Sequence, residues 1–387
     1  MRIIVFILSS FLFRFTHEAC LCQENVKSDA DTFNLGGQLS AWLNYNYRNP
    51  LPVNAGGRYL PAVNYGIKLS GQQFLDFEAS ANIYGSIGFH PLDKSFTEGA
   101  VKPYRFWARY SSDQFELRLG LQKINFGSAS LLRPLMWFDQ IDPRDPLQLT
   151  DGVWGLLARY YFLNNTNIWL WGLYGNHGVR GWESIPLNKK LPEFGGRIQL
   201  VIPGGEAAVT YHHRTADSRA MGMTVPECDQ IPENKFGIDA KWDLLTGIWI
   251  EGSLTNRRRD LGIMTNQLVI NAGIDYTIGI GTGLYIAYEH LLITNDIKPF
   301  GFDNRMTFSV LSANYPVGLF DKFGAIFFYN WTSESLYSFV SWQRQFDNIM
   351  LYFIGFLNPE QYELPSTSGS SNMFAGKGLQ IMIVFNH

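Results

Sequence analysis

The chain has 387 residues, of which 46% are hydrophobic, 15% aromatic and 17% charged, and its formal net charge is -3. This composition excludes an intrinsically disordered protein. The near-neutral charge excludes a protein that binds nucleic acid through its phosphates. The length allows one large domain or two to three ordinary ones.

The first 22 residues have the pattern of a secretory signal peptide. Arg2 precedes an apolar run from Ile3 to Phe13, which is too short to span a membrane as a helix, because about 20 residues are needed. Cys20 and Cys22 stand at the -3 and -1 positions of a cleavage site that makes Gln23 the first mature residue. Processing as a lipoprotein at one of these cysteines is the alternative to cleavage by signal peptidase I.

Residues 23-32 are then expected to form a short periplasmic segment, and residues 33-387 the main domain. Cys228 is the one cysteine after residue 22, so the exported protein has no intramolecular disulfide. No segment after residue 22 reaches the 18 or more apolar residues of a helical membrane span.

The main domain shows a hydrophobic period of two residues, which indicates β-strands. Between Leu75 and Ile83, for example, apolar side chains alternate with polar ones such as Asp76 and Glu78. The same alternation occurs at 235-243 and 267-277. We predict about eighteen strands, centred near residues 40, 64, 80, 105, 118, 157, 170, 197, 209, 239, 251, 270, 286, 308, 325, 340, 352 and 381.

The connections between these strands alternate in length along the chain. Long ones such as 48-58, 90-99 and 126-151 alternate with short ones such as 70-73, and the sequence "TSES" at 332-335 is the one exception. Long loops at one end and tight turns at the other are typical of barrels in the bacterial outer membrane. We therefore predict an all-β protein, a transmembrane antiparallel up-and-down β-barrel of 16 to 18 strands, because lipid accepts no open sheet edge.

The stretch "LRLGLQKINFG" at 117-127 places polar side chains between leucines. Arg118 and Gln122 lie on one face of the predicted strand and the leucines on the other. In a barrel, we expect the leucines to meet lipid and the two polar residues to face the lumen. In the long loop that follows, four of the charged residues stand around two prolines: Asp139, Asp142, Arg144 and Asp145.

Residues 116-155 resemble a group of porin-like and alginate-export-type outer-membrane barrels, which show an R-x-G-x-Q strand, an aromatic-Gly step and a D-x-x-N-P-x-D loop. The matching residues are Arg118, Gly120, Gln122, Phe126, Gly127, Asp139, Pro143 and Asp145. Asp142 replaces the usual asparagine, and Phe126 replaces a commoner tryptophan. The resemblance covers about a tenth of the chain and implies an outer-membrane channel, without a substrate.

Two interpretations of this loop remain open. In the first, the loop folds into the barrel and forms a constriction that selects solutes by charge and size. In the second, its carboxylates cap a short helix and pair with arginines, which stiffens an extracellular loop. The other positions predicted to face inward carry both signs of charge and include Asp76, Glu78, Lys235, Asp239, Lys241, Glu251, Glu289 and Arg305.

Neither an active site nor a metal site is predicted. His212 and His213 are adjacent on one strand and therefore point to opposite faces. Cys228 stands alone and the histidines are scattered, which is unlike a zinc site. We expect no cofactor and no catalysis. The run of Arg257, Arg258 and Arg259 is expected in an extracellular loop, either solvated or bound to lipopolysaccharide phosphates.

The sequence thus predicts a porin-like channel for passive diffusion of small hydrophilic solutes or oligosaccharides across the outer membrane of a Gram-negative bacterium. The alternative is a non-conducting barrel that acts as a scaffold or as a component of surface-glycan binding or export. Lipid and lipopolysaccharide are the expected partners, and a homo-oligomer is left open. A barrel of this size normally encloses an aqueous channel, but salt bridges of its own could also plug it.

Overall fold

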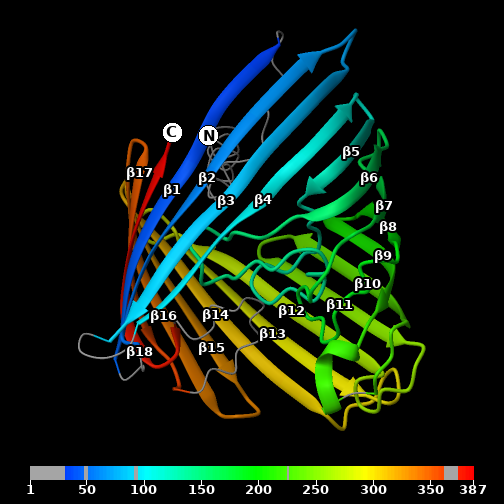
Figure 1. Ribbon diagram of the computed structural model, residues 1–387. Helices are drawn as coiled ribbons and strands as arrows, with labels where there is room; N and C mark the ends of the chain where they lie inside the picture. The colour runs from blue at the N-terminus through cyan, green and yellow to red at the C-terminus, as the bar shows by residue number, and fades with distance from the viewer. Residues whose placement is uncertain (1–30, 48–50, 91–94, 225, 361–373) are drawn as a thin grey trace.

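Eighteen antiparallel strands form one closed sheet in the computed structural model (Figure 1). The structure describes residues 31-47, 51-90, 95-224, 226-360 and 374-387, so the predicted signal peptide and residues 23-30 lie outside the described residues. The barrel closes because β1 pairs with both β2 and β18. The strands are β1 (Thr32–Tyr47), β2 (Val53–Lys68), β3 (Phe74–Phe89), β4 (Ser95–Ser111), β5 (Phe115–Gln122), β6 (Val153–Tyr161), β7 (Asn167–Leu173), β8 (Glu193–Ile202), β9 (Gly205–Ala216), β10 (Ile231–Asp243), β11 (Gly247–Arg257), β12 (Asn266–Ile278), β13 (Leu284–Asp296), β14 (Arg305–Val317), β15 (Asp321–Asn330), β16 (Ser335–Phe346), β17 (Ile349–Leu357) and β18 (Lys377–Asn386).

The period-two pattern explains the two faces of this sheet, and all eighteen predicted strand centres lie within strands. Side chains on the outer rows are apolar and exposed, as with Leu119 at 61%, Val209 at 64% and Ile238 at 59%. The inner rows carry buried polar groups; on β9, His212 is fully buried whereas its neighbour His213 lies on the outer row. An apolar outer face on a closed sheet is the surface that lipid requires.

The alternation of long and short connections is confirmed except at the first two long ones. Residues 53-58 and 95-99 were expected in loops, but they belong to β2 and β4. The glycines of this part of β2 leave room for a neighbour, since a Cβ on Gly56 would lie 2.3 Å from the Trp42 ring on β1. Gly56 therefore reflects close packing between strands. The short connection near "TSES" is confirmed, because β16 starts at Ser335.

One long connection, residues 123-152, leaves the wall after β5 and is called the inward loop below. β5 pairs only with Phe106–Ser111 of β4, so the first part of β4 has no strand neighbour on that side in the described part of the chain. The end of the inward loop lies there instead. The Arg105 guanidinium donates to the carbonyl of Thr150 at 3.0 Å, and Lys102 pairs with Asp151.

A 3-10 helix, Arg219–Thr224, lies in the connection between β9 and β10. None of the helical structure in the described residues is long and apolar enough to cross a membrane.

Candidate functional site

The inward loop is held against the inner wall by buried carboxylates. Glu289 on β13 accepts hydrogen bonds from the backbone N–H groups of Ser130, Leu131 and Leu132, the shortest at 2.6 Å. Glu251 on β11 accepts from the N–H groups of Ala129 at 2.9 Å and Leu135 at 2.6 Å. Charge-assisted hydrogen bonds of this kind are about twice as strong as neutral ones. The two carboxylates therefore act as anchors for the loop.

Apolar side chains of the inward loop contact three separate parts of the wall. Phe126 stacks on Trp171 of β7, with 5.7 Å between the ring centroids. Leu132 belongs to a buried cluster with residues of β12 to β17, and Leu147 belongs to another with residues of β17 and β18. The loop therefore crosses the barrel interior, which Figure 1 also shows.

Two ion pairs form within the inward loop. Arg133 binds Asp139 at 3.1 Å, and Arg144 binds Asp142 at 2.5 Å. Asp145 accepts the N–H group of Leu147 at 3.0 Å. Burial raises the pKa of the Asp145 carboxyl, although that hydrogen bond opposes the effect.

Each interpretation of the loop is thus right in one respect. The loop folds into the barrel, as the first requires, and its charges form internal pairs, as the second requires. The expected short helix is not found, since residues 123-152, all of them described, form turns and bends. The carboxylates bind arginines and backbone N–H groups instead of capping a helix.

Arg118 and Gln122 face inward, as predicted, but both are buried in the wall. Arg118 is 5% exposed, lies 3.0 Å from Glu116 and stacks over the ring of Trp107 at 4.8 Å. Gln122 is fully buried and donates to the carbonyls of Arg118 and Gly155. Hydrogen bonds to the backbone explain a glutamine at this position, where β5 ends and the inward loop begins.

Two glycines of the same motif have backbone conformations that favour glycine. Gly120 has φ 121°, and a Cβ there would lie 2.1 Å from the carbonyl oxygen of Phe106 on β4. Gly127 has φ 109°, and a Cβ there would lie 2.5 Å from the carboxylate of Glu251. The second glycine therefore lets the loop approach its anchor.

We expect Gly127→Ala to destabilise the folded barrel by about 1–3 kcal/mol, because the new Cβ is strained at this φ and displaces Glu251. The temperature at which heating changes the mobility of the folded protein on a gel measures this loss. Gly172→Ala is the matched control, since its Cβ would meet nothing within 4 Å. Equal midpoints for the two variants would contradict the role given to Gly127.

The remaining predicted lumen residues lie in different places. Glu78 is 6% exposed on the inner row of β3, and its carboxylate lies 3.4 Å from the hydroxyl of Ser80. Arg305 is a correction: it is exposed at the start of β14. The inner row of β14 is formed by even-numbered residues such as Phe308 and Val310, so the odd-numbered Arg305 lies on the outer row. Its neighbour on β13 is Thr294.

Arg257 is a second correction. It was expected in a solvated loop, but it is the last residue of β11 and is 2% exposed, with its Nε 2.8 Å from Glu233. Arg258 and Arg259 are exposed, as expected of a loop.

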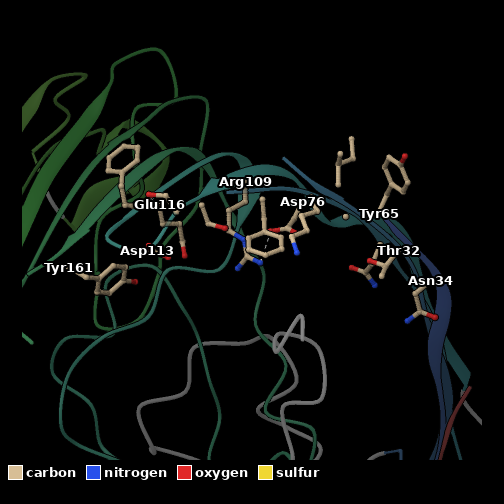
Figure 2. A pocket seen from close by; sticks show the side chains of 16 residues that line it. Thr32, Asn34, Tyr65, Asp76, Arg109, Asp113, Glu116 and Tyr161 are labelled. Atoms are coloured by element: carbon tan, nitrogen blue, oxygen red, sulfur yellow. Dashed lines mark hydrogen bonds and ion pairs between the residues drawn. The ribbon is translucent and has the colours of Figure 1, made fainter. Parts of the chain in front are cut away.

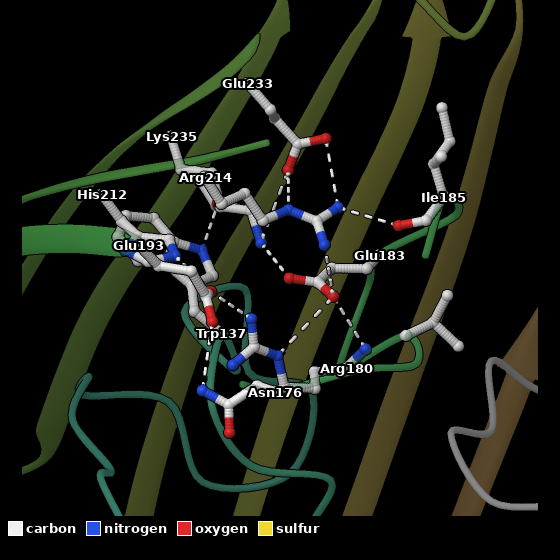
Figure 3. A network of polar contacts seen from close by, with 12 residues as sticks. Trp137, Asn176, Arg180, Glu183, Ile185, Glu193, His212, Arg214, Glu233 and Lys235 are labelled. Atoms are coloured by element: carbon white, nitrogen blue, oxygen red, sulfur yellow. Dashed lines mark hydrogen bonds and ion pairs between the residues drawn. The ribbon is translucent and has the colours of Figure 1, made fainter. Parts of the chain in front are cut away.

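A buried group of charged residues joins the wall to the connection between β7 and β8, residues 174-192, called the β7–β8 loop below. Arg214 lies at its centre, 2.6 Å from Glu233 and 3.0 Å from Glu183, and Lys235 lies 2.6 Å from Glu183 (Figure 3). The group, called the charge network below, consists of Arg180, Glu183, Glu193, His212, Arg214, Glu233, Lys235 and Arg257.

The charge network holds the β7–β8 loop inside the barrel. Burial opposes ionisation of Glu183, yet Arg214, Lys235 and Arg180 hold the pKa of this loop carboxyl below its ordinary value. Only Lys235 of this network was predicted to face inward. The alternation of side chains between the two faces of a strand would also have placed His212, Arg214 and Glu233 inward. Nothing in the sequence predicts which of these residues form ion pairs with one another.

A cavity of about 320 Å³ opens at the short-turn end of the barrel (Figure 2). Its lining includes Asp76, Arg109, Asp113 and Glu116, and Arg109 donates to Asp76 at 2.8 Å. Both signs of charge therefore line this cavity, which is called the vestibule below. The described residues contain no group of three or more His, Cys, Asp or Glu that could hold a metal ion.

The closed antiparallel barrel, with its longest connection turned inward, has the fold of the porin-like barrels. Pseudomonas aeruginosa OccD3 has a similar structure, with a TM-score of 0.59 and 9% sequence identity over 92% of this chain and 91% of that chain. Acinetobacter baumannii OccAB4 gives a TM-score of 0.55 and 9% identity, covering 94% of this chain and 100% of that chain. Salmonella typhi OmpF gives a TM-score of 0.50 and 8% identity, covering 94% and 99%.

At these identities the likeness concerns the fold. No protein-family model matches the chain, and the search of curated proteins found no match.

Proposed function

We propose that the protein is a channel of the bacterial outer membrane for passive diffusion of small hydrophilic solutes. The observation that carries this proposal is the inward loop, which crosses a closed eighteen-stranded barrel and is anchored by Glu251 and Glu289. A loop in this position narrows the lumen, and fixed charges at a narrow point set selectivity. The mechanism needs neither a cofactor nor a covalent step.

The predicted boundaries and partners belong to the same proposal. Residues 1-22 direct export, and the apolar outer rows contact lipid. Lipopolysaccharide surrounds the loop end, where the exposed Arg258 and Arg259 lie. Oligosaccharides are among the solutes worth testing. Assembly into a homo-oligomer is compatible with this barrel.

Single-channel recording in a planar bilayer tests the proposal. Refolded full-length protein, whose gel mobility shifts on heating, is expected to give discrete conductance steps. Silence from correctly folded protein would contradict the proposal and favour a plugged barrel.

We expect Arg118→Glu to shift the reversal potential in a KCl gradient toward cation selectivity. The substitution replaces a positive charge with a negative one beside Glu116, which lines the vestibule, and a buried charge is screened little by salt. Arg219→Glu is the matched control, because that side chain is 60% exposed in the connection between β9 and β10. A reversal potential that moves equally in both variants, or in neither, would count against a lumen role for Arg118.

A further inference from the structure

A small cavity lies where the inward loop, the β7–β8 loop and the wall meet. Its lining includes Trp137 of the inward loop and, from the β7–β8 loop, Arg180, Trp182 and Glu183. The wall contributes Glu233, Lys235, Thr255 and Arg257, so three cations and two carboxylates line the cavity. Its volume of about 10 Å³ is close to that needed by one water-sized molecule. Whatever occupies the cavity touches all three elements.

Two arginines that line this cavity have donor groups without a hydrogen-bond partner. Arg180 and Arg257 are 7% and 2% exposed, and Nη1 of Arg180 and Nη2 of Arg257 bind no acceptor in the described part of the chain. Their other groups are engaged: Arg180 binds Glu193, and Arg257 binds Glu233 and the carbonyl of Met264. Because buried donors are almost always satisfied, an acceptor is expected in this cavity.

The charge network also has an excess of positive charge. Its four cations are Arg180, Arg214, Lys235 and Arg257, and its three carboxylates are Glu183, Glu193 and Glu233. His212 adds no charge, since its Nδ1 accepts a hydrogen bond from Trp171 at 3.2 Å, which requires the neutral ring. Four cations against three carboxylates leave one unbalanced positive charge, which is costly in a buried site.

We propose that the cavity binds one monovalent inorganic anion of the size of chloride. The anion accepts hydrogen bonds from Arg180 and Arg257 and balances the excess charge. Water would satisfy the donors without balancing the charge, and an organic anion is too large for the space. Because Arg180 belongs to the β7–β8 loop and Arg257 to the wall, the anion ties this loop in place inside the barrel.

The first test is thermal unfolding of the full-length protein in detergent, with sodium chloride or sodium gluconate at equal ionic strength. Chloride and bromide are expected to raise the unfolding temperature in a saturable way, whereas gluconate is not. Arg257→Gln is expected to lose this response, and Arg258→Gln, which changes the exposed neighbour, is expected to keep it. An identical response to chloride and gluconate would overturn the proposal.

Since Arg257→Gln removes a partner of Glu233 and could prevent folding, a measurement on the unchanged protein completes the test. Crystals grown in sodium bromide are expected to show an anomalous diffraction peak between Arg180 and Arg257. Density there without an anomalous signal would identify a water molecule and overturn the proposal. Silence in the bilayer would overturn the channel function, but it would leave the bromide peak unaffected, so the two proposals fail separately.

Discussion

Glu289→Ala is expected to free the inward loop from the wall and to increase single-channel conductance by about twofold or more, because the loop lies at the narrow point of the barrel. The substitution removes the acceptor for the N–H groups of Ser130, Leu131 and Leu132. It also removes a partner of Asn271, whose side chain binds the carbonyl of Leu132.

The same substitution is expected to lower the free energy of unfolding by at least about 3 kcal/mol, since hydrogen bonds to a charged group contribute about 1.5–3 kcal/mol each. Conductance and urea unfolding in detergent measure the two effects. Glu206→Ala is the matched control, because it removes an exposed carboxylate next to a turn. Unchanged conductance, with the loop as resistant to protease as before, would show that Glu289 does not anchor it.

Arg214→Met is expected to cost about 3–5 kcal/mol of folding free energy, because it leaves buried carboxylates without their main partner. Arg214 is fully buried and pairs with Glu183 and Glu233, which are also buried. Urea unfolding of the protein in detergent measures the loss.

The control for this prediction is Arg219→Met. Arg219 also pairs with a carboxylate, that of Asp217, but its side chain is 60% exposed, and exposed pairs contribute about 0–1 kcal/mol. Similar losses in the two variants would mean that burial does not determine the strength of the charge network. Protease cleavage within 174-192 is expected to increase in the Arg214 variant alone, because this network holds the β7–β8 loop.

The barrel itself could be predicted from the sequence because the pattern that indicates each strand lies within a few consecutive residues. Side chains alternate between the two faces of any strand, so a period of two residues indicates both the strand and its orientation. This reasoning placed Arg118, Gln122, Glu251 and Glu289 on the inner face. It failed at Arg305, where the predicted parity of the strand was wrong.

The sequence was misleading at residues whose role depends on a side chain of the neighbouring strand. The glycines of 53-58 suggested a loop, but they belong to β2, and Gly56 makes room for Trp42 of β1. Arg257 suggested a solvated loop, but Glu233 and Met264 bind it at the end of β11. Trp42 and Glu233 became neighbours of these residues only through strand pairing.

By itself, the sequence determined where the strands lie, the faces of most of them and most of the alternation of loops and turns, since each depends on residues a few positions apart. Only the tertiary structure decided that the longest connection turns inward, because its anchor Glu289 lies 159 residues from Ser130 in the chain. It likewise decided which charges pair in the charge network. Closure of the sheet brings these residues together, and no local pattern records the distance between strands that are far apart in sequence.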